Sequence, residues 1–105
     1  MVPARLGTEP VMFDVLMNLT DEYLGDIIDE ILEKYYSDTR LMIDYEDLLE
    51  YITMEIVEKN ENADDYETFH KLVKKLARQR SLARVFVSYL ISKYLEQYIP
   101  EEEVR

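Results

Sequence analysis

The hydrophobic positions of this chain recur at intervals of three and four residues along most of its length. Leu24, Ile27, Ile28, Ile31 and Tyr35 form one such series, and carboxylates occupy most positions between them. A period near 3.6 places these apolar side chains on one face of an α-helix. The same period returns in residues 45–58 and 68–78. The pattern therefore predicts amphipathic helices and indicates no strand.

Capping residues mark where these helices are expected to begin. Thr8, Thr20, Asp44 and Asn62 can each accept a hydrogen bond from a free amide at a helix start, and carboxylates closely follow the last three. Ser81 either begins a last helix or lies inside a longer one. Only two glycines and three prolines interrupt the chain. We expect an all-α protein, a small four- to five-helix bundle with no sheet.

The last segment, residues 82–99, is apolar on nearly all sides. A helix of this kind has to be covered on most of its surface. It is therefore predicted to be either the central helix of the bundle or a surface through which the chain forms a homodimer. The residues assigned to self-association are Val87, Ile91, Tyr94 and Tyr98.

Length and composition narrow the classes of protein further. The 105 residues fit a single helical domain, with residues 1–7 flexible and residues 101–105 an acidic tail. With no cysteine and one histidine, disulfides, thiolate sites and multi-histidine metal sites are excluded. No apolar run is long enough to span a bilayer, so a cytoplasmic location without membrane contact is expected. The abundance of tyrosine, isoleucine, glutamate and lysine resembles proteins of thermophilic archaea or their viruses.

Charge is sorted along the chain. The formal net charge is −11, but residues 1–67 contain nineteen acidic and four basic residues, whereas residues 68–95 contain seven basic residues and no acidic one. This basic segment either complements the acidic helices, within the bundle or between subunits, or binds an acidic protein partner or a nucleic acid. The candidate binding patch consists of Lys71, Lys74, Lys75, Arg78, Arg80 and Arg84.

Within that segment, residues 72–93 (LVKKLARQRSLARVFVSYLISK) resemble a helix-turn-helix. Ser81 stands at the turn, and Arg84 and Ser88 face outward from the second helix. The resemblance implies that these two side chains reach phosphates or base edges of DNA. Phe86 and Tyr89 depart from the pattern, because a recognition helix usually presents polar groups to the groove.

Two carboxylate pairs, Glu30-x-x-Glu33 and Asp47-x-x-Glu50, resemble the metal-binding spacing of all-α nucleotide pyrophosphohydrolases. Both pairs lie opposite the apolar stripe of their helix, so we expect them to face water instead of converging on an ion. His70 has no evident acidic partner other than Glu67 and is expected to be a surface residue. No catalytic residue, cofactor or metal site is predicted.

These observations favour a non-enzymatic, acidic, helical interaction or regulatory protein that binds a protein partner and associates with itself. The alternative is a dimeric helix-turn-helix transcriptional regulator that binds DNA through residues 71–93. A remote alternative is an all-α, metal-dependent nucleotide pyrophosphohydrolase.

Overall fold

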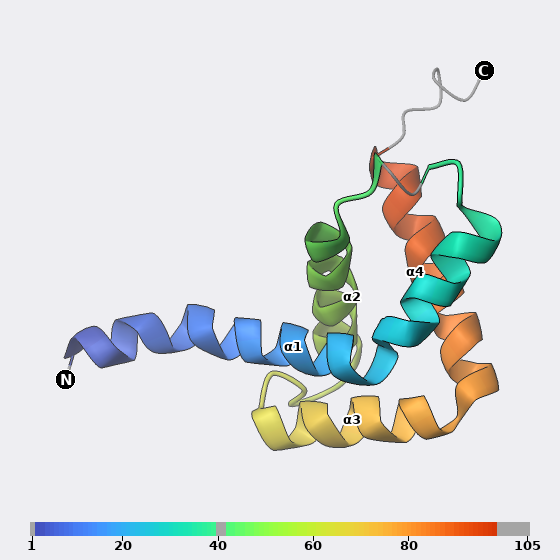
Figure 1. Cartoon of the computed structure of the whole chain (residues 1–105). Helices are drawn as coiled ribbons and strands as arrows, with labels where there is room; N and C mark the ends of the chain where they lie inside the picture. The colour runs from blue at the N-terminus through green and yellow to red at the C-terminus, as the bar shows by residue number, and fades with distance from the viewer. Residues whose placement is uncertain (1, 40–41, 99–105) are drawn as a thin grey trace.

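The computed structural model of the chain contains four α-helices (Figure 1). It describes the backbone of residues 2–39 and 42–98 and the side chains of residues 12–39 and 42–97. The helices are α1 (Val2–Tyr35), α2 (Tyr45–Lys59), α3 (Tyr66–Arg78) and α4 (Arg80–Tyr98). No strand occurs in this part of the chain, which is 85% helical. The predicted all-α bundle is confirmed.

Helix α1 joins two segments that the sequence pattern separates. Thr20, expected to cap a second helix, lies inside α1, and its buried hydroxyl donates to the carbonyl of Leu16 at 3.1 Å. The predicted break is therefore wrong. The physical reason is that the buried positions Leu16, Leu19 and Leu24 stay in phase across Thr20, so one continuous helix buries them all. Residues 2–7, expected to precede the first helix, also belong to α1.

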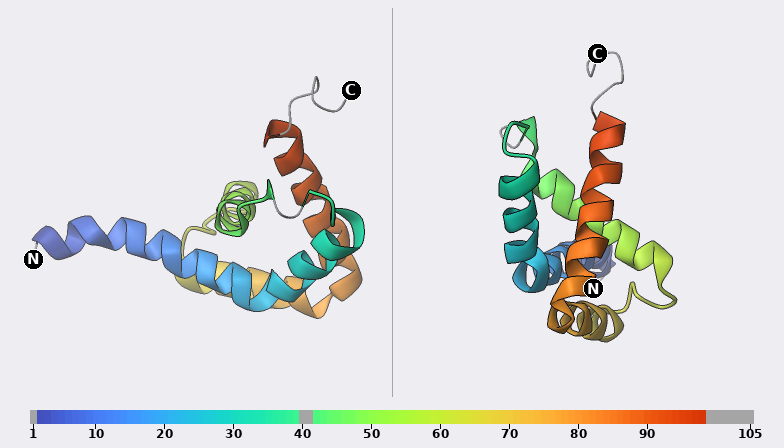
Figure 2. Two further views of the ribbon diagram at one scale, coloured as in Figure 1. Left: turned by 45° about the horizontal axis from the view of Figure 1, so that its top comes forward. Right: turned by 90° about the vertical axis from the view of Figure 1, so that its right-hand side faces the viewer.

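The course of α1 gives the molecule an elongated shape. Its first half extends beyond the other helices as an arm, and the helix bends before its second half runs beside α4 (Figures 1 and 2). The chain measures 53 × 31 × 21 Å along its principal axes. Two residues within α1 can loosen the helix: Thr20, whose hydroxyl bonds back to a carbonyl, and Gly25.

Aspartate caps begin the next two helices. Asp44 accepts hydrogen bonds from the amides of Glu46 and Asp47, as the sequence predicts for α2. For α3 the cap is Asp65, which accepts from the Thr68 amide, and not the predicted Asn62. Asn62 instead takes a left-handed conformation (φ 64°) in the turn before α3. Asparagine tolerates this conformation better than most residues, which explains its place there.

The hydrophobic core lies where all four helices meet. Helix α1 contacts α2, α3 and α4, and α3 and α4 form a steep corner (Figures 1 and 2). From α4, the core receives Ala83, Val87, Leu90, Ile91 and Tyr94. A single residue, Gln79, separates α3 from α4, and its amide donates to the carbonyls of Lys75 and Leu76. Ser81 accordingly lies inside α4.

Candidate interaction surface on helix α4

One side of α4 stays uncovered after the core is complete. Leu82, Val85 and Tyr89 are 54%, 68% and 52% exposed, whereas Val87 and Leu90 are fully buried. The spacing of three and four residues places the exposed trio in one stripe along the helix. Together with the two grooves that flank it, we call this stripe the α4 face.

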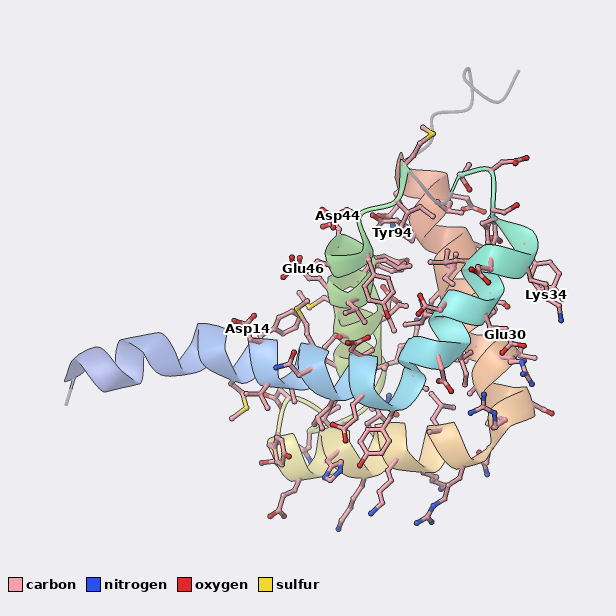
Figure 3. All side chains as sticks on the ribbon, in the orientation of Figure 1. Asp14, Glu30, Lys34, Asp44, Glu46 and Tyr94 are labelled. Carbon is pink, nitrogen blue, oxygen red and sulfur yellow. The ribbon has the colours of Figure 1, made fainter. Side chains whose placement is uncertain are left out.

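The first groove lies between α4 and the second half of α1. It has a volume of about 500 Å³ and is bounded on the α4 side by Val85 and Tyr89. From the end of α1, Tyr35 adds a ring that is 69% exposed. Glu30 and Lys34 form the rim, and Figure 3 shows both on the same side of α1. The groove is therefore apolar in its walls and charged at its edge.

The second groove lies on the other side of the stripe, where the end of α2, α3 and the start of α4 meet. Its volume is about 250 Å³. The lining residues are Ile56, Asn60, Leu72, Val73, Lys75, Leu76, Gln79, Leu82 and Phe86. Leu82 lines the second groove and Val85 lines the first, and both belong to the exposed stripe. The two grooves therefore border one continuous apolar surface.

The six residues of the predicted basic patch lie on two helices, α3 and α4, and two of them form ion pairs. Arg84 makes a bidentate contact with Glu30, with both oxygens at 3.0 Å, and Arg80 lies 3.5 Å from Asp26. These two arginines thus pair with carboxylates of α1, as one of the two sequence interpretations expects. The other four patch residues, Lys71, Lys74, Lys75 and Arg78, lie on α3, and all six residues of the patch are exposed. Nitrogen-tipped side chains extend outward along α3 in Figure 3.

Three of the four residues assigned to self-association lie in the core. Val87 and Ile91 are fully buried and Tyr94 is 3% exposed, so none of them can contact a second copy while the fold is closed. The hydroxyl of Tyr94 donates to Asp47 at 3.1 Å. The side chain of Tyr98 lies outside the described residues. Both sides of α4 are apolar, and the side that packs in the core is the one that contains Val87, Ile91 and Tyr94. Self-association itself stays a prediction.

The corner between α3 and α4 departs from a helix-turn-helix. One residue joins the two helices, whereas that motif uses a turn of three to four. Arg84, which the resemblance turns toward DNA, is engaged by Glu30, and Ser88 lies half-buried in the first groove. Carboxylates of α1 therefore stand beside the helix that would have to approach phosphates.

Carboxylates from both predicted pairs, and His70, have structural partners. Glu30 binds Arg84, and Asp47 accepts from Tyr94. Among the side chains that the structure describes, no group of three or more His, Asp or Glu could hold a metal ion. His70 is half-buried, with Nε2 2.9 Å from the hydroxyl oxygen of Tyr23. Its ring lies between those of Tyr23 and Tyr66, so it links α3 to α1.

Comparison of the chain with protein-family models, curated proteins and solved structures finds no match. Within residues 2–39 and 42–98, no helix is long and apolar enough to cross a membrane.

The charges around the α4 face differ from those of the rest of the chain. Lys34 stands at the first groove and Lys75 at the second, and the Lys93 ammonium lies 5.8 Å from the centre of the Tyr89 ring. Glu96 is the acidic residue of α4. Because Glu30, also at the rim of the first groove, is paired with Arg84, the apolar strip keeps a basic rim in a chain with a net charge of −11. Sequence reasoning missed Tyr35, Leu82 and Val85, although the spacing of Leu82, Val85 and Tyr89 is visible in the sequence.

Proposed function

We propose that this chain is a non-enzymatic interaction protein of the cytoplasm, which regulates a protein partner by binding it through the α4 face. The partner segment is an amphipathic helix whose apolar side chains are flanked by carboxylates. The observation that carries the proposal is the exposure of Leu82, Val85 and Tyr89 on a helix whose opposite side is fully packed.

An apolar stripe between two grooves suits a helical occupant. Helix-in-groove recognition places apolar side chains at intervals of three and four residues into such a surface. Fully burying a Leu, Val or Tyr side chain that is about half exposed contributes on the order of 1 kcal/mol. Three such residues, together with Tyr35 at the edge, supply the apolar centre that protein interfaces require.

The charge of the rim selects an acidic occupant. Lys34, Lys75 and Lys93 surround the stripe, and carboxylates on a partner would lie opposite them. DNA phosphates could also contact these lysines, but the arginines of α4, Arg80 and Arg84, are already paired with Asp26 and Glu30. The strong net negative charge of the chain also opposes DNA binding, because non-specific affinity for a duplex comes from neutralising its phosphates with cationic side chains.

The test compares three fluorescent probes by anisotropy. They are a synthetic helical peptide with leucines at intervals of three and four and glutamates elsewhere, the same peptide with lysines for glutamates, and a pool of random DNA duplexes. We expect the glutamate peptide to bind and the lysine peptide not to bind. Val85→Glu should abolish this binding. Met42→Glu, at an exposed residue before α2 that lines neither groove, makes the same type of change away from the α4 face and should leave it intact.

Other results overturn the proposal. Equal binding of both peptides would remove the assigned role of the lysine rim, and absence of binding would remove the α4 face as a docking site. Retention of duplexes that yield a consensus, lost on Arg84→Ala, would replace the proposal with the helix-turn-helix regulator.

A further inference from the structure

Helix α2 presents an acidic ridge to the outside of the molecule. Glu46, Glu50, Met54 and Glu58 follow one another at intervals of four residues, and all four are exposed. Met54 is 44% exposed, which leaves an apolar side chain among three carboxylates. Figure 3 shows Glu46 near the end of α2 where the helix begins. The ridge therefore combines one exposed apolar side chain with flanking carboxylates, the charge that the lysine rim of the α4 face favours.

We propose that the acidic ridge of α2 in one copy of this chain docks on the α4 face of a second copy. This inference rests on the proposed function, because it names the occupant of the same surface. It differs from the homodimer through α4 that is expected from the sequence, since here two unlike surfaces meet.

The two surfaces match in length and in charge. Glu46 to Glu58 spans twelve residues, or about 18 Å of helix, and Leu82 to Lys93 spans eleven, or about 16 Å. Met54 near the middle of the ridge would contact Val85 and Tyr89. The glutamates on either side of it would lie near the lysine rim.

A two-fold contact between two α4 faces is less favourable. It would bring Lys34, Lys75 and Lys93 of both copies together, and like charges across an interface oppose association. The ridge and the α4 face also point in different directions. Ile56, on the inner side of α2, lines the second groove, whereas Met54 and Glu58 lie on the outer side. The contact is therefore head-to-tail and generates either rings or chains of copies.

Sedimentation of the full chain at rising concentration tests this inference through charge reversal. One variant carries Glu46→Lys with Glu50→Lys, and the other carries Lys75→Glu with Lys93→Glu. All four residues are exposed, so each variant should keep the helical circular dichroism of the parent. We expect each variant alone to associate about tenfold more weakly. An equimolar mixture of the two should regain association, because the reversed ridge of one fits the reversed rim of the other.

Lys74→Glu is the matched control, since Lys74 is exposed on α3 but lines neither groove. Its association should equal that of the parent chain. A parent chain that stays monomeric at high micromolar concentration overturns the inference, as does association that the reversals leave unchanged or that the mixture does not restore. The glutamate peptide distinguishes the two proposals: if it binds a monomeric chain, the α4 face keeps its function and the second copy is not its occupant.

Discussion

The hydroxyls of Thr20 and Thr53 meet at 2.8 Å inside a core that is otherwise apolar. Thr20 has a single hydroxyl hydrogen, and it is donated to the Leu16 carbonyl. Thr53 is therefore the donor in the pair, and Thr20 accepts. The Thr53 hydroxyl of α2 thus donates to Thr20 of α1, and Thr20 donates to the Leu16 carbonyl, so both hydroxyl hydrogens have an acceptor.

Because the two threonines have different roles, their substitutions should have different costs. Thr53→Val removes the donor but leaves the Thr20 hydrogen bonded to Leu16, so we expect a loss of about 1 kcal/mol. Thr20→Val deprives the Thr53 hydroxyl of its acceptor and should cost about 2 kcal/mol. The double variant leaves no hydroxyl unsatisfied and should be more stable than Thr20→Val alone. Urea unfolding of the four proteins measures this cycle, and strictly additive losses would contradict it.

The two sides of α4 should respond oppositely to a charge. Ile91→Asp buries a carboxylate with no cationic partner in the core and should cost more than about 4 kcal/mol, enough to unfold a marginal domain. Val85→Asp adds the same carboxylate to a residue that is 68% exposed and should change stability by less than about 0.5 kcal/mol. Thermal unfolding followed by circular dichroism separates the two. A folded Ile91→Asp protein would show that the assigned core is incorrect.

Gly25 should reveal a competition between helix propensity and a tertiary contact. The Tyr45 hydroxyl donates to Asp21 at 2.8 Å, and a Cβ added at Gly25 would lie 2.7 Å from the same Asp21 oxygen. In Tyr45→Phe this hydrogen bond is absent and Asp21 can move, so Gly25→Ala should stabilise the chain by about 1 kcal/mol. In the parent chain the gain should be largely offset by the displaced Asp21. Equal effects of Gly25→Ala in both backgrounds, by urea unfolding, would refute the coupling.

Stability at alkaline pH should depend on Tyr51. Burial, followed by the neighbouring Glu55, raises the pKa of Tyr51 above its ordinary value of 10.0. The folded state therefore holds this proton more tightly than the unfolded state. The resulting stability is fully present below pH 10.0 and is lost as the pH rises through the raised pKa. Tyr51→Phe should remove part of the alkaline decline in the free energy of unfolding, and an unchanged decline would contradict the assignment.

The helical part of the fold could be predicted from local patterns because each helix has its own apolar period and α2 has an evident cap at Asp44. The continuity of α1 across Thr20 could not be predicted in this way. A threonine before two carboxylates is a typical helix start, but here its hydroxyl bonds back to Leu16 and outward to Thr53, a residue 33 positions away. Only the tertiary partner distinguishes a cap from a buried hydroxyl.

The candidate site was harder to predict, for a related reason. Both sides of α4 are apolar, and the choice of inner side depends on the helices that surround it. The basic segment presents the same difficulty: Arg84 lies 54 positions from Glu30, so the ion pair that engages this residue of the predicted patch has no local signature. What could be predicted is that α4 contains more apolar surface than a single face needs.

The one-residue corner at Gln79 makes the two grooves mechanically unlike. Leu76 of α3 and Leu82 of α4 both line the second groove, and the junction between their helices has an amide that is already bonded to two carbonyls of α3. That groove has a preset width and loses little conformational entropy when it is filled. The first groove is walled by the last turns of α1, which lead into the turn after Tyr35. A bound helix would therefore meet a preformed second groove, whereas the first groove would have to adjust to it through a change in the conformation of Tyr35.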